Sequence, residues 1–255
     1  FNKNNVEFPN LEEAHVSEAT YYRLYITDHI DIEESLIYID PDVICLNDPI
    51  QELEALLIKL ENSEFVVSAY PETLKSKKNV EEFQRLLMDG DKLFNAGVML
   101  IDYKKWKNAN LTSKLTKRLY EIYDDIVFWD QDVLNSFFNS NFLELDKKLN
   151  YKINDFNNIE MNSYQNISKI KKDIIFAHYS GKFKPWTVRG TFHPSSSFYH
   201  ELYSSLSYRN YHIENNWKGQ ALKDLVKSIF NREIFKLDKP WSFFTSVLNY
   251  LFKIR

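Results

Sequence analysis

The fold of this chain is decided by residues 35–42, which read Ser-Leu-Ile-Tyr-Ile-Asp-Pro-Asp. A short β-branched and aromatic run is typical of a buried strand, and we predict a strand of a parallel sheet over 35–39. Pro41 ends the strand because proline cannot donate a ladder hydrogen bond. Side chains two residues apart share one side of extended backbone, so Asp40 and Asp42 are predicted to point the same way at the strand's carboxyl end.

The sequence on either side alternates between strand and helix patterns. Apolar runs predict further strands over 64–69, 94–102, 143–149 and 174–178. Caps and apolar stripes predict helices over 17–26, 50–60, 80–87, 111–123 and 130–138. This alternation predicts an α/β fold, in which helices flank a sheet.

The composition excludes several classes of protein. The chain has 255 residues, 44% of them hydrophobic and 16% aromatic, which suits a large globular domain with or without an appendage and excludes a disordered or collagen-like polymer. The lone Cys45 permits neither a disulfide framework nor a cysteine zinc site. The formal net charge of -4 argues against nucleic acid as a partner.

The start of the chain carries no signal peptide, and no apolar run reaches the ~18 residues that a membrane span needs. We therefore expect a cytoplasmic protein. Because the first residue is Phe1 and not methionine, we also expect the sequence to be a fragment of a longer chain.

The character of the sequence changes near residue 182, where aromatic and basic residues increase and the sheet pattern ends. We predict a main domain over 1–190 and a helical region over 191–255, with helices over 221–230 and 241–252.

The last helix has an apolar face that allows two interpretations. Its members are Trp241, Phe244, Val247, Leu248, Leu251 and Phe252. With the lysines and arginine that flank it, this face could make a peripheral contact with the inner membrane leaflet. Alternatively it packs against the main domain or a second subunit.

The Asp40 and Asp42 pair is the first candidate for chemistry. Ligands of open α/β sheets bind at the carboxyl ends of strands, where this pair is predicted to lie. Like charges this close repel one another, which makes a divalent metal their natural partner. The alternative is a solvated Asp-Pro-Asp turn.

The second candidate is the motif His178-Tyr-Ser-Gly-Lys-Phe-Lys-Pro-Trp186. An imidazole suits a metal, Gly181 lets backbone approach a ligand, and a lysine such as Lys184 suits phosphate. The alternative is a structural histidine followed by a solvated loop.

Three more stretches of the sequence carry polar groups near strand or helix ends. Asn95, next to Gly97, presents an amide to a sugar hydroxyl or else enters a turn. Asp130-Gln131-Asp132 offers acceptors to a ligand or else caps a helix. Arg23 lies among aromatic residues, where stacking and surface solvation are the simplest expectation.

In their order along the chain, these motifs resemble those of glycosyltransferase family 8, which includes bacterial lipopolysaccharide galactosyl- and glucosyltransferases. The resemblance extends from about Thr20 to Trp186. It rests on Tyr22-Arg23, Tyr38-Ile-Asp-Pro-Asp-Val43, Phe94-Asn-Ala-Gly-Val98, Asp130-Gln-Asp-Val-Leu-Asn135 and the motif over 178–186. It implies a GT-A fold, with a mixed, mostly parallel sheet flanked by helices and here a helical C-terminal extension.

The resemblance also implies a metal and a donor. Asp40, Asp42 and His178 match the family's ligands for Mn²⁺, with Mg²⁺ as the second choice. Gly181 and Lys184 match positions that hold the diphosphate of a UDP-sugar.

The positions that match the surroundings of the transferred sugar are Arg23, Asn95, Asp130 and Gln131. The family retains anomeric configuration. Because the amide oxygen of Gln131 is a poor nucleophile, front-face attack is favoured over a covalent intermediate, with Asp130 orienting hydroxyls.

Two features depart from the family pattern. Pro41 replaces the small residue that more often separates the two acids, although both carboxylates remain. The family's first strand and helix, which receive uracil and ribose, are expected before Phe1.

The implied function is a hexosyltransferase that moves galactose or glucose to a glycan acceptor, which could be a lipid-linked glycan, a capsule precursor or a glycoprotein. The alternative is an inactive glycan-binding or nucleotide-sugar-binding module of the same fold. A sugar-nucleotide pyrophosphorylase would need a glycine-rich triphosphate loop, which the 5 glycines do not supply.

Overall fold

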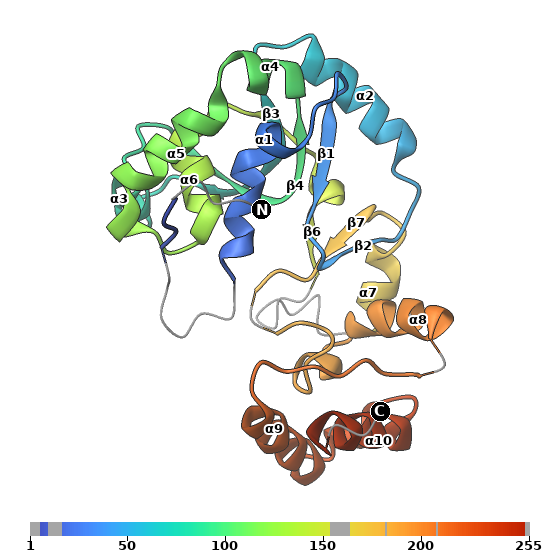
Figure 1. Cartoon of the computed structure of the whole chain (residues 1–255). Coiled ribbons are helices and arrows are strands. Elements are labelled where there is room, and N and C mark those ends of the chain that lie inside the picture. Colours follow the sequence, from blue (N-terminus) through green and yellow to red (C-terminus); the bar gives the residue numbers. More distant parts are fainter. Residues whose placement is uncertain (1–5, 10–16, 154–163, 182, 208, 253–255) are drawn as a thin grey trace. The chain divides into compact units, whose positions relative to one another are not determined.

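The computed structural model describes residues 6–9, 17–153, 164–181, 183–207 and 209–252 (Figure 1). The chain divides into two compact units, the first comprising 1–40 and 49–150 and the second 41–48 and 151–255. The boundary predicted at residue 190 falls inside the second unit and stays a prediction.

A four-stranded sheet organises the first unit in the order β1-β4-β3-β5. Its strands are β1 (Leu36–Ile39), β3 (Val67–Leu74), β4 (Lys92–Ile101) and β5 (Leu143–Glu144). β4 is antiparallel to both neighbours, and β5 is parallel to β3. The sheet is therefore mixed, with β1, β3 and β5 running one way and β4 the other.

The prediction of a parallel strand over 35–39 is wrong in direction. The strand forms as β1, but β4, its hydrogen-bonded partner among the described residues, runs antiparallel to it. β1 is also only half-buried, since Ile37 and Ile39 are exposed. An apolar run reports burial, whereas strand direction depends on where a distant segment, here β4, enters the sheet.

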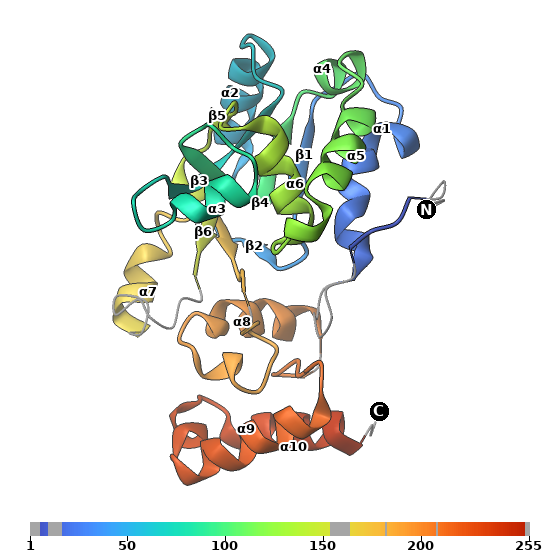
Figure 2. The same cartoon turned by 90° about the vertical axis from the view of Figure 1, so that its left-hand side faces the viewer.

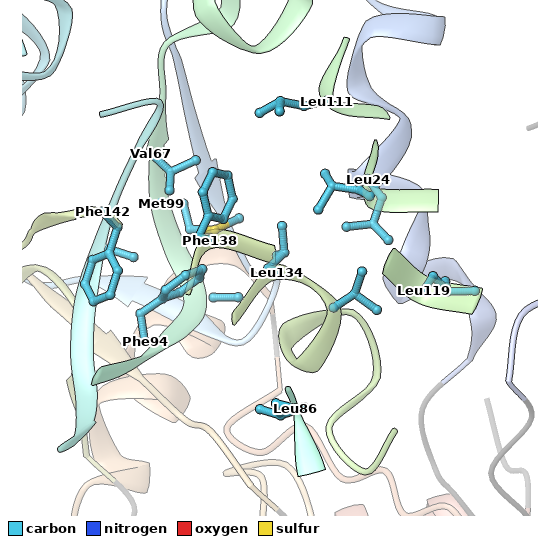
Figure 3. Close-up of a cluster of buried hydrophobic side chains, with 14 of the residues drawn as sticks. Leu24, Val67, Leu86, Phe94, Met99, Leu111, Leu119, Leu134, Phe138 and Phe142 are labelled. Carbon is cyan, nitrogen blue, oxygen red and sulfur yellow. The ribbon is translucent and has the colours of Figure 1, made fainter. Parts of the chain in front are cut away.

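Helices and one large apolar core complete the first unit. Its helices are η1 (Glu18–Tyr25), α1 (Ile26–His29), α2 (Ile50–Glu61), α3 (Val80–Arg85), α4 (Tyr103–Asn108), α5 (Leu111–Glu121), η2 (Tyr123–Asp125), α6 (Trp129–Phe138) and η3 (Lys147–Leu149). Leu24 of η1, Met99 of β4 and Leu134 of α6 meet in the buried core (Figure 3). The stripe predicted on α5 is buried there too.

The strand predicted over 143–149 is shorter than expected. Only Leu143 and Glu144 pair with β3, and a 3-10 turn, η3, follows. The Asp146 carboxylate accepts a hydrogen bond from the Lys148 amide at 2.9 Å, which caps that turn and ends the extended backbone.

The second unit is built on a three-stranded sheet in the order β2-β7-β6. Its strands are β2 (Val43–Cys45), β6 (Tyr151–Lys152) and β7 (Phe176–His178). β7 is antiparallel to β2 and parallel to β6, and Val43 pairs with His178. This register brings the residue after Asp42 opposite the first residue of the second motif.

Helices form the rest of the second unit. They are α7 (Tyr164–Ile170), η5 (Gly190–Phe192), α8 (Ser196–Leu206), α9 (Lys218–Phe230), η6 (Glu233–Lys236) and α10 (Pro240–Phe252). Figure 2 shows α9 and α10 side by side. Among the described residues, no helix is both long and apolar enough to cross a membrane.

The apolar face predicted on the last helix is divided in the structure. Phe243 and Val247 are buried in the core of the second unit, and Phe244 and Leu251 pack partly against it. Trp241 and Phe252 are exposed, together with the α9 stripe of Leu222, Val226, Ile229 and Phe230. Packing therefore uses only part of the predicted face of α10, and the exposed apolar surface includes α9.

Candidate functional site

In the first unit, Arg23 is the centre of a buried ionic cluster. Its Nε lies 2.6 Å from Asp130 Oδ2, and its Nη2 lies 3.3 Å from Asp40 Oδ1. Nη1 donates a hydrogen bond to the Ala96 carbonyl at 2.7 Å, and the guanidinium lies 4.2 Å from the centre of the Tyr38 ring. The prediction of stacking is confirmed, but the expected surface solvation is wrong, since only 8% of the side chain is exposed.

The two carboxylates that Arg23 pairs are held by further donors. Thr20 Oγ1 donates to Asp130 Oδ1 at 2.6 Å, and the Tyr38 hydroxyl donates to Asp40 Oδ1 at 2.7 Å. Burial raises the pKa of Asp130 to about 6, although Arg23 and Thr20 oppose the rise. The charge on Asp130 therefore depends on Arg23 staying in place.

The first turns of α6 are fastened to β4 by side-chain amides. Gln131 Oε1 accepts a hydrogen bond from the Ala96 amide at 3.0 Å. Asn135 Oδ1 accepts from the Phe94 amide at 2.7 Å, while Asn135 Nδ2 donates to the Phe94 carbonyl at 2.9 Å. Asn135 thus satisfies both the amide and the carbonyl of a buried strand residue, Phe94. These bonds fix the position of the first turn of α6, which carries Gln131.

Of the three acceptors predicted at this helix start, Asp132 is the one that binds the amides of the loop before the helix. Its Oδ2 accepts from the amides of Val127 and Phe128, each at 2.8 Å, and from Arg85 at 2.7 Å. Trp129, between this loop and Asp130, has φ of +48°, an uncommon backbone conformation for a bulky residue.

Asn95 lies within β4 and is part of a polar chain. Its Oδ1 accepts from the Gly97 amide at 3.0 Å and from Asn150 Nδ2 at 2.9 Å, and its Nδ2 donates to Glu72 at 3.1 Å. The Gly97 carbonyl in turn accepts from the Asp40 amide at 2.8 Å. Asn95 and Asp40 are therefore both hydrogen-bonded to Gly97, Asn95 through its side chain and Asp40 through its backbone amide.

In the second unit, Asp42, His178 and Lys184 come together. Asp42 Oδ1 lies 3.4 Å from His178 Nε2, and Lys184 donates a hydrogen bond to Asp42 Oδ2. Lys184 also donates to the Tyr179 carbonyl at 2.8 Å, while the Tyr179 amide donates to the Asp42 carbonyl at 3.0 Å. The structure therefore joins Asp42 to the 178–184 motif through both backbone and side chains.

The electrostatics of Asp42 suit a cation ligand. Burial raises the pKa of its carboxyl, but His178 and Lys184 outweigh burial and hold that pKa at about 2. Oδ1 is buried and accepts no hydrogen bond from the described residues. A charged oxygen without a donor, next to an imidazole, is a donor set that fits a divalent transition metal.

Gly181 occupies an open, left-handed position in the same loop. Its φ is +87°, which favours glycine, and no atom lies within 4 Å of where a Cβ would be. The backbone at this point is free to approach a ligand.

The two groups of residues are linked by the chain itself. Asp40 ends the first segment of the first unit, and Asp42 lies two residues later in the second unit. Of the three candidate metal ligands, Asp42 and His178 belong to the second unit and Asp40 to the first.

Comparison with known proteins identifies the family. Residues 2–189 match the model described as glycosyl transferase family 8. The chain belongs to glycosyl transferase family 8.

Two lipopolysaccharide transferases are among its relatives. The chain is 29% identical to a lipopolysaccharide 1,3-galactosyltransferase of Salmonella typhimurium, covering 84% of this chain and 63% of that protein. It is 30% identical to a lipopolysaccharide 1,2-glucosyltransferase of Escherichia coli, covering 85% of this chain and 63% of that protein. The chain therefore spans less than two thirds of the length of either relative.

Solved structures show the fold. The galactosyltransferase LgtC, solved with donor and acceptor sugar analogs, superposes with a TM-score of 0.62 at 24% identity, covering 85% of this chain and 76% of that one. The bifunctional glycosyltransferase WbbM superposes with a TM-score of 0.51 at 24% identity, covering 70% of this chain and 34% of that one. The family 8 chain thus has the predicted GT-A fold, an α/β fold with mixed sheets flanked by helices.

Several residues that build the candidate site were not singled out by sequence. Thr20 and Tyr38 bind the two paired carboxylates, and Asn135 fastens α6. Tyr38 and Asn135 lie inside the motifs, two and four residues from Asp40 and Gln131, and this closeness is the signal that could have found them. Thr20 lies 110 residues from its partner and had no local signal.

Proposed function

We propose that this family 8 chain is the catalytic part of a retaining, metal-dependent hexosyltransferase that moves galactose or glucose from a UDP-sugar to a glycan acceptor. The observation that carries this proposal is the Asp42 group, in which a carboxylate with a lowered pKa and an unsatisfied oxygen lies beside an imidazole and a lysine. The named activities of the lipopolysaccharide relatives support the choice of hexose.

In this proposal, Asp40, Asp42 and His178 hold the metal, each with one carboxylate oxygen or imidazole nitrogen. A bound Mn²⁺, or Mg²⁺ as the second choice, neutralises charge on the departing diphosphate. Lys184 and the open backbone at Gly181 bind the same diphosphate.

The sugar is oriented by the residues around Arg23. Arg23 holds Asp130 ionised so that the carboxylate can accept hydrogen bonds from sugar hydroxyls, and Asn95 supplies a second polar group. Because Gln131 Oε1 accepts the Ala96 amide and Asp130 is paired, neither oxygen is available as a strong nucleophile. Front-face attack by the acceptor hydroxyl remains the favoured route to retention.

The test is metal-dependent release of UDP from UDP-galactose and UDP-glucose. Asp42→Asn keeps the side-chain size but removes the charge, and it should lower the rate by at least ~100-fold, as expected for a group that supports charge in the transition state. Asp124→Asn, at an exposed acid on η2, is the matched control. Undiminished release by Asp42→Asn contradicts the proposal.

Binding of UDP-sugar and metal without release by the wild-type chain would instead support the inactive binding module. Titration of Mn²⁺ by calorimetry reads the metal site in either case, and the release of UDP separates the transferase from the binding module.

We further propose that the C-terminal helices bind the inner, cytoplasmic membrane surface peripherally, where lipid-linked acceptors are found. An exposed stripe on α9, with Leu222, Val226 and Phe230 four residues apart, supports this. Lys218, Lys223 and Lys227 lie on the same helix, and lysines favour anionic lipid.

Vesicle co-sedimentation tests the membrane contact. Phe230→Ser should reduce binding to phosphatidylglycerol-containing vesicles, whereas Leu74→Ser, at an exposed leucine of β3, should not. Equal binding by wild type and Phe230→Ser would contradict this contact.

A further inference from the structure

An aromatic cluster in the second unit, outside the residues assigned above, has the chemistry of a sugar-binding platform. It consists of Trp186, Tyr199, Tyr203 and His212. The Tyr203 and His212 rings are stacked, with centroids 5.2 Å apart and planes 18° apart. The Tyr199 and Tyr203 rings are within 11° of parallel. The near-parallel rings are those of Tyr199, Tyr203 and His212, whereas the Trp186 ring is tilted by 50° to Tyr199 and lies at the edge of the set.

The platform is partly open to solvent. All four rings are half-buried, unlike the large aromatic side chains of the core, which are covered. Between Arg209 and Ile213 the backbone alternates, with Tyr211 and Ile213 buried and His212 on the more open side. Segment 209–217 passes between α8 and the α9–α10 pair (Figures 1 and 2). The alternation of burial leaves the His212 ring on the more open side, next to the Tyr203 ring of α8.

A small pocket adjoins the platform. Its volume is about 100 Å³, and Tyr203 and His212 line it together with Arg209, Ser246 and Asn249. On this measure a site for one water needs about 10–15 Å³, so the pocket has room for several hydroxyl groups of a ligand. The lining carries one fixed cation and no carboxylate, which suits neutral hydroxyls better than a diphosphate or an acidic peptide.

The platform is attached to the loop that carries Lys184. His200 Nε2 of α8 lies 2.9 Å from the Pro185 carbonyl, and the Glu214 amide donates to the Trp186 carbonyl at 2.8 Å. Both elements that carry the rings are therefore bonded to the two residues that directly follow Lys184. A ligand on the platform is held by the same backbone as the proposed diphosphate site.

Geometry and chemistry together define the ligand. A pyranose has C–H groups on its faces, which pack on the electron-rich faces of aromatic rings, and hydroxyls on its rim, which need hydrogen-bonding groups. We propose that Trp186, Tyr199, Tyr203 and His212 bind a saccharide of the acceptor glycan, with its rim in the pocket beside Arg209. This inference rests on the proposed transferase function.

The role of each group follows from its contacts. The Tyr199 hydroxyl and His212 Nδ1 are 2.6 Å apart, and this hydrogen bond holds both rings in position. Tyr203 supplies ring surface for the sugar face. Arg209 is exposed and supplies donors at the pocket.

Saccharide binding is measured on the intact chain without donor or metal. The probes are the methyl β-glycosides of galactose, glucose and N-acetylglucosamine, observed by saturation-transfer NMR. At least one should bind the wild type at millimolar concentration. Tyr203→Leu, which keeps apolar bulk but removes the ring face, and Arg209→Gln should each raise Kd about tenfold or more. Tyr120→Leu is the matched control, because Tyr120 is exposed and stacked on Tyr123 in the other unit.

Turnover gives a second readout. In Tyr203→Leu, the ratio of sugar transfer to donor hydrolysis should fall about tenfold. This fall should come from a higher KM for the acceptor. Because Arg209 is exposed, Arg209→Gln should fold normally. It therefore still tests the inference if Tyr203→Leu fails to fold.

The inference is overturned if none of the three glycosides binds, or if both variants bind them as the wild type does. The inference is also overturned if Tyr203→Leu loses binding to vesicles while its binding of saccharide is unchanged. In that case the rings contact lipid and not sugar. Absence of UDP release by the wild type would contradict the proposed function alone, because the NMR measurement needs no turnover.

Discussion

The Arg23 cluster of the first unit and the Asp42 group of the second differ in how completely the protein satisfies their charges. Arg23 contacts two carboxylates, a carbonyl and a ring, and its carboxylate partners have additional hydroxyl donors. Asp130 Oδ2 and Asp42 Oδ1 both accept no hydrogen bond from the described residues, but the first lies 2.6 Å from Arg23 Nε. The second lies 3.4 Å from His178 Nε2, beside a glycine loop with open space. Buried polar groups are normally paired, so the difference indicates preorganised structure around Arg23 and ligand binding around Asp42.

Of the changes considered, replacing Arg23 should cause the largest loss of stability. Arg23→Met leaves Asp130 buried without its cation, and breaking a buried pair costs about 3–5 kcal/mol. Urea unfolding should show this loss of stability. Arg118→Met, which removes a half-exposed pair with Glu121, should cost at most about 1 kcal/mol. Similar losses in both variants would show that the Arg23 cluster is not a special anchor.

Removing the amide of Asn135 should have the next largest effect. Asn135→Leu leaves the buried amide and carbonyl of Phe94 without their partner, at about 1–3 kcal/mol for each group. Donor turnover should fall as well, because Gln131 loses its support. The control is Asn108→Leu, at an exposed position of α4, which should unfold at nearly the wild-type urea concentration.

Acid should destabilise the second unit through His200. Burial lowers the pKa of His200 to about 4, so the unfolded chain binds the proton more readily between pH 6.5 and pH 4. Stability is therefore lost as pH falls through that window, by roughly 3 kcal/mol at pH 4. His200→Gln should flatten this part of the pH profile of unfolding, and His29→Gln, at an exposed histidine, should leave it unchanged. An unchanged slope in His200→Gln would be the contrary result.

Replacing Lys184 should have the smallest effect on stability and a large one on ligand binding. Lys184→Met removes a charged hydrogen bond to Asp42, at about 1–2 kcal/mol, because both side chains are partly exposed. The affinity for UDP should fall much further, about tenfold or more. Calorimetry with UDP and Mn²⁺ measures the second quantity. If stability fell as far as in Arg23→Met while UDP affinity did not change, the two regions would have the opposite of the roles assigned here.

Local sequence patterns predicted much of the fold, because the spacing of apolar residues along a segment depends on that segment alone. The apolar stripe of α5 and the strand over 36–39 both form as expected. The direction of β1 was mistaken, since an apolar run carries no information on which distant strand will pair with it. The last helix was assigned a single apolar face, whereas its packing depends on Tyr211 and Ile213, which come from another segment.

By itself, the sequence determined which chemical groups this protein has: two acids around Pro41, a histidine and lysine six residues apart, and the family to which these motifs belong. Only the tertiary structure decided their partners. Thr20 and Arg23 reach Asp130 more than 100 residues away, and α8 brings aromatic rings to the loop after Lys184. Composition and spacing record what a segment can do, whereas charge pairing and ring stacking depend on distances that exist only once the chain has folded.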